Sequence, residues 1–227
     1  MPRAPFESNP MRNLQLLPLL LTAVEATATI AFALSGLLEA ARKRLDVVGV
    51  CVVAGLAAFG GGTLRDVLLD RRPFFWVEHA TWLWALLALC VGAMALLRAH
   101  HFAPTEKAMQ WPDALGLGLF SASGTQLALV QGLPPIVAVL MGVVTATFGG
   151  VLRDVVCNEI PCAFRDHRPY AVCAFVGGWV LVGGRALGLP DGATVLAAAG
   201  TATGLRALAL LTDYRLPQWS SDGEARD

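Results

Sequence analysis

Long apolar runs, separated by short breaks that contain charged residues or proline, dominate this chain. An α-helix needs about 20 apolar residues to cross the hydrocarbon core of a bilayer, and most of the runs approach or exceed this length. Inside a bilayer the backbone must satisfy its own hydrogen bonds, and a helix does so within one segment. The pattern predicts an all-α integral membrane fold with seven transmembrane helices, at 16–38, 47–70, 80–97, 113–130, 134–158, 169–188 and 192–212.

The first run also has features of a cleaved signal peptide, because Arg3 and Arg12 precede its apolar stretch. That stretch, however, continues through Glu25 to Leu38, well beyond the apolar region of a signal peptide. We therefore expect the run to remain as the first span.

Composition narrows the class of protein. Apolar residues make up 56% of the chain and charged residues 15%, against roughly 25% charged residues in ordinary soluble domains. The 17 basic and 17 acidic residues cancel, so the chain offers no polycationic surface for nucleic acid. We expect residues 1–227 to form a single membrane domain.

The basic residues of the predicted loops and tails are unevenly distributed. Nine Lys and Arg residues lie on the side that holds the C-terminus, and five lie on the other side. Cytoplasmic loops of membrane proteins carry the excess of Lys and Arg. The bias predicts a cytoplasmic C-terminus and an N-terminus outside. We expect a multi-pass protein of a cell inner membrane.

The sequence repeats itself at an offset of 88 residues. Each copy holds three predicted spans, an odd number, so the second copy enters the membrane in the opposite direction. Inverted repeats are a recurring plan of transport proteins, whose working site lies near the bilayer midplane. We expect a 3+3 inverted repeat, 25–97 and 113–185, with 192–212 as an additional seventh helix. Two segments match between the copies: GGTLRDV at 61–67 aligns with GGVLRDV at 149–155, and FALSG at 32–36 aligns with FSASG at 120–124.

Consecutive glycines interrupt the second and fifth spans, at Gly60-Gly61-Gly62 and Gly149-Gly150. Each glycine weakens a helix by roughly 1 kcal/mol relative to alanine, and such a run permits a kink or a short unwound segment. The alternative is close helix packing at small residues. We expect helices two and five to be broken at these glycines.

Two charged pairs, Arg65-Asp66 and Arg153-Asp154, follow these glycines inside apolar surroundings. An Arg or Asp at the centre of a span costs about 2.5–3.5 kcal/mol, so these side chains must pair or face a cavity. Adjacent helical residues point roughly 100° apart, so an arginine does not readily meet the aspartate next to it. Pairing across the repeat, Arg65 with Asp154 and Arg153 with Asp66, is one solution. One interpretation is a buried ion-pair network that closes the helix ends. The other, which we prefer, adds a water-filled route that the arginines border.

Four more polar residues are matched by the repeat. Glu25 lies within the first apolar run and is a candidate pore-facing residue, whereas Asp113 follows Pro112 at the expected start of a helix and is a candidate N-terminal cap. Ser35 and Ser123 lie at mid-span. A small polar residue there suits either tight helix approach or the lining of a route, and the sequence leaves both open.

Patterns of enzymatic chemistry are missing from the sequence. The glycine run precedes Thr63-Leu64-Arg65-Asp66 rather than the Lys-Ser/Thr that binds nucleotide phosphates and metal. The five cysteines lie in or near apolar runs without metal-ligand spacing, which is typical of buried thiols. We expect neither an enzyme nor a cofactor nor a metal site.

The doubled motif, GGGTLRD at 60–66 and FGGVLRD at 148–154, resembles the prokaryotic branch of the trimeric intracellular cation (TRIC) channel family. The resemblance covers about residues 14–212. It implies a homotrimer among membrane lipids, with a pore in each protomer lined by the first, second, fourth and fifth spans. The pore passes monovalent cations, chiefly K⁺ with Na⁺ as a second candidate. Gating is implied at glycines and nearby basic residues, here Gly60, Gly61, Gly62 and Arg65, and Gly149, Gly150 and Arg153.

Animal members of that family carry a lysine-glutamate-valine motif that binds a phosphoinositide, with Ca²⁺-linked regulation. Arg65-Asp66-Val67 keeps only the residue types of this motif. We therefore do not expect regulation by that lipid or by Ca²⁺.

Two other functions remain open. The same bacterial domain is also classed as a glycine transporter, and facing half-helix ends at the breaks would suit the carboxylate and ammonium of an amino acid. A scaffold that transports nothing would instead leave the interior dry and both arginines fully paired. We expect a K⁺-permeable channel driven by the electrochemical gradient.

Overall fold

The computed structural model describes residues 10–99 and 105–217, and every helix or strand assigned in this part of the chain is an α-helix. The all-α prediction is therefore confirmed. The helices are α1 (Pro10–Arg42), α2 (Val47–Leu68), α3 (Phe75–Glu78), α4 (Thr81–Ala99), α5 (Glu106–Val130), α6 (Pro135–Val156), α7 (Cys162–Arg165), α8 (Ala171–Ala186) and α9 (Asp191–Thr212).

Each predicted span overlaps one long helix, and the largest difference at a helix start within the described residues is that of α5. It begins at Glu106, ahead of the expected residue 113, because Thr105 caps it by accepting a hydrogen bond from Ala108 N at 3.2 Å. The first turns of α5 are polar, so hydropathy alone did not assign them to a helix.

Within the part of the chain that the structure describes, four helices are long and apolar enough to cross a membrane by length and composition. Two further apolar helices are shorter, and α5 carries buried polar residues along its length. The predicted count of seven crossings is therefore not confirmed by these criteria and stays a prediction. The four are Leu17–Arg42, Val47–Leu68, Pro135–Val156 and Asp191–Thr212; the shorter two are Thr81–Leu96 and Ala171–Ala186.

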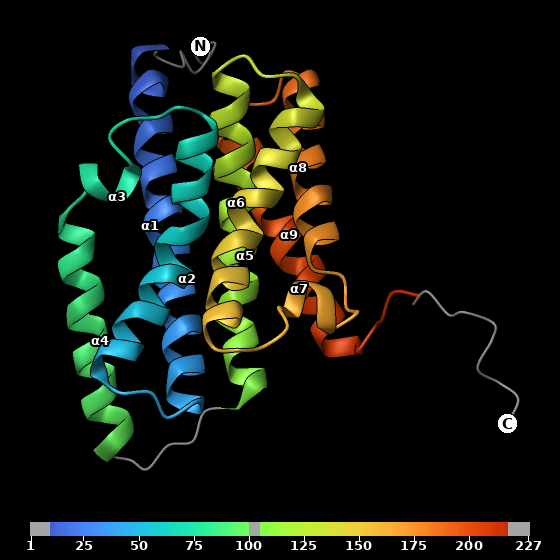
Figure 1. The fold of residues 1–227 in the computed structure, drawn as a ribbon. Helices are drawn as coiled ribbons and strands as arrows, with labels where there is room; N and C mark the ends of the chain where they lie inside the picture. The colour runs from blue at the N-terminus through green and yellow to red at the C-terminus, as the bar shows by residue number, and fades with distance from the viewer. Residues whose placement is uncertain (1–9, 100–104, 218–227) are drawn as a thin grey trace, which may run out of the picture.

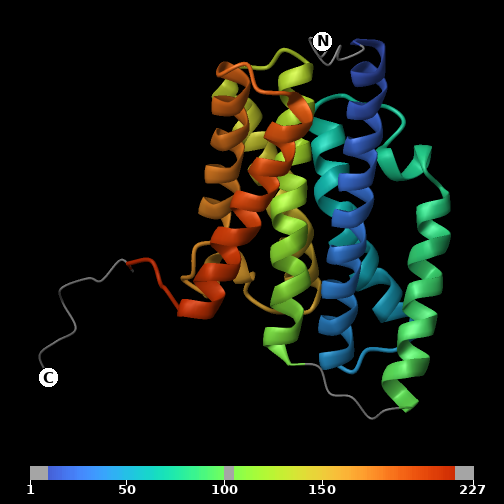
Figure 2. The ribbon, with the colours of Figure 1, turned by 180° about the vertical axis from the view of Figure 1, so that it is seen from behind.

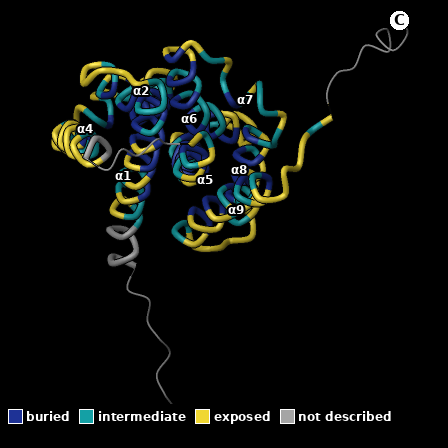
Figure 3. Tube along the Cα trace, turned by 90° about the horizontal axis from the view of Figure 1, so that it is seen from below, coloured by how far each residue is buried: buried dark blue, intermediate teal, exposed yellow. Residues whose placement is uncertain are grey.

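Four helices form a closed ring at the centre of the bundle. α1 packs on α2, α2 on α6, α6 on α5 and α5 on α1. α4 lies outside α2, whereas α8 and α9 lie on the opposite side (Figure 1). Seen along the bundle, the buried residues face the space between the helices (Figure 3). α1 and α5 run side by side in opposite directions (Figure 2).

The last turns of α2 and α6 are alike. Asp70 and Asn158, which lie 88 residues apart, both adopt the left-handed conformation, with φ of 50° and 57°. The backbone N–H of the next residue closes the turn onto the carbonyl oxygen of Asp66 in one helix, at 2.8 Å, and of Asp154 in the other, at 2.9 Å. Residues matched in the sequence thus adopt matched backbone conformations here.

Candidate functional site

α2 and α6 touch at the glycines of the repeated motif. A Cβ atom on Gly61 would collide with the carbonyl oxygen of Thr145, and one on Gly149 would collide with that of Ala57. These two contacts are related by the same 88-residue offset as the motif. Glycine is needed at both positions because only a residue without a side chain lets the two backbones approach this closely.

The expected breaks at these glycines are not found. α2 and α6 are each one continuous helix through Gly60-Gly61-Gly62 and Gly149-Gly150. Glycine leaves the helical backbone hydrogen bonds in place, and here its small size serves close helix packing, which was the alternative interpretation. A change of helix direction at the glycines stays a prediction.

The first charged cluster forms around Arg65, whose side chain is 0% exposed. Its guanidinium pairs with the carboxylate of Glu25 from α1, and its Nε donates to Asp66 Oδ1 at 2.9 Å. Asp66 Oδ2 accepts a hydrogen bond from Phe75 N at 2.8 Å. The Phe75 ring centroid lies 5.3 Å from the guanidinium carbon of Arg65. Asp66 therefore holds both the arginine and the start of α3.

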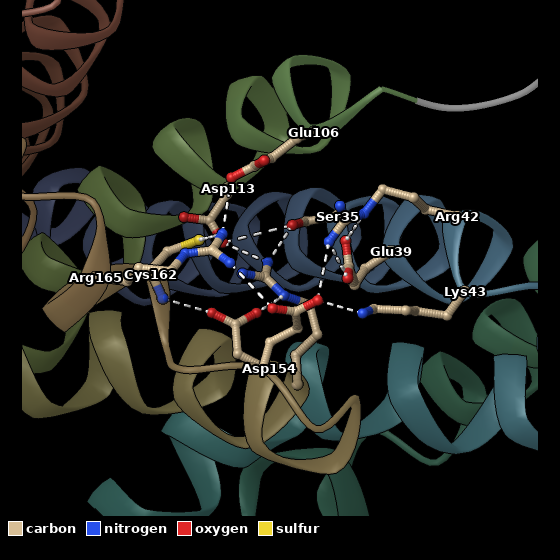
Figure 4. A network of polar contacts seen from close by, with 11 residues as sticks. Ser35, Glu39, Arg42, Lys43, Glu106, Asp113, Asp154, Cys162 and Arg165 are labelled. Atoms are coloured by element: carbon tan, nitrogen blue, oxygen red, sulfur yellow. Dashed lines mark hydrogen bonds and ion pairs between the residues drawn. The ribbon is translucent and has the colours of Figure 1, made fainter.

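The second cluster forms around Arg153, whose side chain is 1% exposed. Figure 4 shows its partners Ser35, Asp113 and Asp154 from close by. Arg153 Nη1 donates to Asp113 Oδ1 at 2.6 Å and to Ser35 Oγ, and Nε donates to Asp154 Oδ1 at 2.8 Å. Asp154 Oδ2 accepts from Cys162 N at 2.8 Å. The second cluster repeats the plan of the first, with a serine added.

The predicted pairing across the repeat is wrong. Each arginine binds the aspartate that follows it, Asp66 or Asp154, and its distant partner is Glu25 or Asp113. The angle of roughly 100° separates the Cα–Cβ bonds of adjacent residues. A guanidinium stands at the end of a long flexible side chain, so it reaches sideways to the short neighbouring carboxylate.

Asp113 is not an N-terminal cap, which corrects a second prediction. α5 begins at Glu106, so Asp113 lies inside the helix, where its carboxylate binds Arg153. Glu25 pairs with Arg65 and its side chain is 12% exposed. Whether Glu25 faces a pore stays a prediction.

Ser35 and Ser123 are both buried, but their surroundings differ. Ser35 Oγ accepts from Arg153 and lies 3.4 Å from Asp113 Oδ1. Ser123 Oγ has no hydrogen-bond partner among the residues that the structure describes. The structure therefore brings Ser35, but not Ser123, into a hydrogen-bonded cluster.

Six further charged residues, which sequence reasoning missed, lie around the Arg153 cluster (Figure 4). Arg165 joins two of the acids, with Nη2 2.9 Å from Glu106 and Nη1 3.0 Å from Glu159. One sequence signal was available, the Glu39–Arg42 spacing of three residues on a helix. The other pairs join separate elements. We call the group the outer ionic cluster: Glu39, Arg42, Lys43, Glu106, Glu159 and Arg165.

Glu159 is the centre of the outer ionic cluster and lies in the loop after α6. It accepts a hydrogen bond from Lys43, and Arg165 and Arg42 add their positive charges. These contacts hold the pKa of the Glu159 carboxyl below its ordinary value, the hydrogen bond from Lys43 contributing most.

α5 carries two more buried polar side chains that sequence reasoning did not single out. The polar atoms of Thr125 and Gln126 have no hydrogen-bond partner among the described residues. An unpaired buried amide or hydroxyl costs free energy. Their signal was present, since both interrupt the apolar run 113–130.

Within residues 10–99 and 105–217, no group of three His, Cys, Asp or Glu side chains is arranged to hold a metal ion. The five cysteines are free thiols.

Comparison with known proteins places these features in a family. The family model described as "Glycine transporter" matches residues 22–100 and 110–186. The UPF0126 membrane protein of Vibrio cholerae is 37% identical over 164 residues, which cover 70% of this chain and 66% of that protein, just under two thirds of its length. The UPF0126 inner membrane protein YadS of Escherichia coli is 37% identical over 157 residues, or 69% of this chain and 75% of that protein.

Solved structures share the fold. The TRIC trimeric intracellular cation channel orthologue from Rhodobacter sphaeroides has a TM-score of 0.78 and 34% identity, covering 86% of this chain and 98% of that chain. A prokaryotic TRIC channel solved in 0.5 M KCl has a TM-score of 0.79 and 27% identity, covering 87% and 99%. The chain therefore belongs to the prokaryotic TRIC family, which includes the UPF0126 membrane proteins and is a family of membrane proteins and not of enzymes.

Proposed function

We propose that this protein is a cation channel with one water-filled route in each protomer, running between α1, α2, α5 and α6. The observation that carries the proposal is the pair of buried clusters at Arg65 and Arg153. By formal charge the Arg153 cluster holds two carboxylates and one guanidinium, an excess of one negative charge. At the Arg65 cluster the two carboxylates face Arg65 and also the partly exposed Arg71, whose Nη1 lies 3.6 Å from Asp66 Oδ1, so the formal charges balance.

An excess of carboxylates inside a membrane protein favours cations. Ionisable side chains within a membrane bundle are expensive and mark ion pathways when they face the interior. A net negative charge attracts a cation and repels an anion. The solved relatives are described as cation channels, which supports the same choice. We expect K⁺ to be the main ion and Na⁺ a second one.

Buried polar groups on α5 support hydration of the route. Ser123, Thr125 and Gln126 are buried without hydrogen-bond partners among the described residues. In a dry core such groups would be unfavourable, whereas water molecules would satisfy them. We expect water to reach these side chains when the route is open.

The matched contacts of the two halves support an inverted-repeat architecture. The contact of Gly61 with Thr145 and that of Gly149 with Ala57 are equivalent under the 88-residue offset. We propose that 25–97 and 113–185 form the two copies, with 192–212 as an additional seventh helix. The excess of Lys and Arg on the side that holds the C-terminus supports an N-terminus outside and a C-terminus in the cytoplasm.

The glycines are the proposed moving parts. Gly62 precedes Arg65 by three residues, and Gly150 precedes Arg153 by three. Glycine lowers the cost of bending a helix, and a bend at Gly60-Gly61-Gly62 or Gly149-Gly150 would displace the arginine of that half. We propose that such a motion gates the route.

The assembly and location follow from the relatives. One solved relative is described as trimeric and YadS as an inner membrane protein. We propose a homotrimer in the cell inner membrane, surrounded by lipids.

Recording from purified protein in planar bilayers tests the function. Unitary currents should reverse near the K⁺ equilibrium potential. Saturable glycine uptake without such currents would replace the channel by the transporter. Arg65→Ala or Arg153→Ala should change conductance or open probability. Unchanged currents together with lower thermal stability would leave the arginines a purely structural role.

A further inference from the structure

Gly149 and Gly150, the proposed bending point of α6, are covered on two sides. Gly149 faces α2, whereas Gly150 faces three polar side chains. A Cβ atom on Gly150 would lie 3.1 Å from the hydroxyl oxygen of Tyr170. The same atom would lie 3.5 Å from Asp113 Oδ1 and 3.7 Å from Arg153 Nη2. The hydroxyl of Tyr170 therefore lies at the Arg153 cluster, directly beside the glycine.

Tyr170, at the start of α8, is held from another side by Arg206 of α9. The guanidinium carbon of Arg206 lies over the Tyr170 ring, 4.9 Å from its centroid. Both side chains are buried. The face of an aromatic ring attracts a guanidinium, and the attraction is stronger away from water. Tyr170 thus connects a charge on α9 with the Arg153 cluster.

Arg206 also binds the segment between α7 and α8. Its Nη1 donates to the carbonyl oxygen of Pro169 at 3.1 Å, and its Nη2 donates to Asp166 Oδ2 at 3.4 Å. Arg168 of the same segment binds back to α9, with Nε donating to Asp213 Oδ1 at 2.8 Å where that helix ends. Because α8 and α9 lie side by side (Figure 1), these contacts let α9 fix the backbone at the start of α8.

The first half covers its matched glycine in another way. Gly62, which the 88-residue offset matches with Gly150, lies against α3, and a Cβ atom on it would collide with the ring of Phe75. Phe75 in turn meets Trp82 of α4 edge-on, with ring centroids 6.0 Å apart. Trp82 is the residue that the offset matches with Tyr170. The cover of Gly62 is thus apolar and comes from α3 and α4, whereas the cover of Gly150 is polar and is held by α9.

We propose that Tyr170 and Arg206 are a positioning pair through which α9 holds α6 straight at Gly150, an inference that rests on the proposed channel function. A bend of α6 at this glycine requires the hydroxyl of Tyr170 to move, and the contacts of Arg206 oppose that movement. The pair therefore favours the closed route. It makes α9, which follows both proposed copies of the repeat, the helix that sets how readily the second half opens.

Recordings in planar bilayers from the wild type, Arg206→Met and Tyr170→Phe test the positioning pair. Methionine removes the charge and its hydrogen bonds but keeps an apolar chain, and Asp166 retains Arg168 as an ion-pair partner at 3.5 Å. The ratio of open to closed time should rise at least about fivefold with Arg206→Met, the factor that corresponds to about 1 kcal/mol. The current of a single opening should stay that of the wild type, because Arg206 acts through Tyr170 and does not line the route.

Tyr170→Phe is the milder variant, since it keeps the ring and its contact with Arg206 and removes only the hydroxyl beside Gly150. We expect a smaller rise of the open-to-closed ratio. This variant removes one oxygen atom and leaves no charge unpaired, so it decides the question even where Arg206→Met does not fold.

Leu181→Ala in α8 is the matched control for a general loosening of α8 against α9. Leu181 is fully buried in an apolar cluster with Val195 and Ala198 of α9, about three helical turns from Tyr170. The control should lose thermal stability, because it leaves a cavity, but it should keep the wild-type ratio of open to closed time.

The outcomes separate the positioning pair from the channel. A wild type that conducts, with an unchanged or lower open-to-closed ratio in either variant, would overturn the pair and leave the channel intact. So would an equal rise with Leu181→Ala, or an altered single-opening current with Arg206→Met. An absence of currents from the wild type and from every variant would overturn the channel function and, with it, this inference.

Discussion

The Arg65 and Arg153 clusters have the same arrangement of an arginine and two carboxylates, but they differ in burial and in the number of hydrogen-bond partners. Arg153 has three side-chain partners, one of them Ser35, and the outer ionic cluster lies around it. Arg65 has two acidic partners within hydrogen-bond distance, and one of these, Glu25, is partly exposed. Its matched serine, Ser123, has no hydrogen-bond partner in the described part of the chain.

The difference shows that a repeated sequence need not give two equal halves. The repeated motif builds the arginine–aspartate pair in both, but residues outside the motif decide how tightly each pair is enclosed. Lys43, Glu159 and Arg165 add charge pairs on the Arg153 side. We expect the stability of this end of the protein to depend on pH and salt more strongly than the stability of the Arg65 end does.

Removal of an arginine should have the largest effect on the free energy of unfolding. Comparing Arg65→Ala with Arg153→Ala measures directly how the two clusters differ in stability. Breaking a buried ion pair by removing one partner destabilises a protein by about 3–5 kcal/mol, because a charge is left buried and uncompensated. Arg153→Ala should lie at the upper end of this range, since both of its carboxylates are buried. Arg65→Ala should lie below it, because Glu25 can reach water. Thermal unfolding in one detergent compares the two, and equal losses of stability would remove the distinction between the clusters.

Replacement of Ser35 should have an intermediate effect on the free energy of unfolding. Comparison with replacement of Ser123 tests whether the two matched serines contribute differently to the two clusters. Ser35→Ala removes a hydrogen bond to a charged group, which contributes about 1.5–3 kcal/mol. Ser123→Ala should leave stability unchanged or raise it, since its buried hydroxyl has no partner among the described residues and an unpaired buried hydroxyl costs free energy. Each variant is the control for the other in the same unfolding measurement. A larger loss with Ser123→Ala would mean that Ser123 is bound more firmly than Ser35.

Neutralisation of Glu159 should have the smallest effect, because its side chain is 26% exposed and water screens its ion pairs. Its lowered pKa means that the folded state holds the carboxylate more strongly than the unfolded state does. The stabilisation is present above the unfolded pKa and is lost as the pH falls through the folded pKa. Glu159→Gln should remove this part of the acid sensitivity and of the salt sensitivity.

Unfolding temperatures measured from neutral to acidic pH, at low and at high salt, test the Glu159 prediction. Glu78→Gln, at an exposed acid in α3, is the matched control and should keep the wild-type profile. A Glu159→Gln profile identical to that of the wild type would show that the outer ionic cluster does not stabilise this end.

Helix positions followed from hydropathy because apolar runs are a local property of the chain. The start of α5 was missed because its first turns are polar and are held by Thr105 and by partners on other elements. The motif residues Arg65, Asp66, Arg153 and Asp154 were found because charges inside apolar runs are conspicuous. Their partners were assigned wrongly, because spacing along one helix says nothing about the reach of an arginine.

By itself the sequence determined the helical fold, the 88-residue repeat and the places where charge enters apolar runs, since each is encoded by residue types and their order. Only the tertiary structure decided that Glu25 and Asp113 pair with the arginines, that Gly61 and Gly149 serve helix contact, and that Arg206 meets Tyr170. These outcomes depend on which helices become neighbours and on how far side chains extend. Those are distances in space between residues that are far apart in the chain.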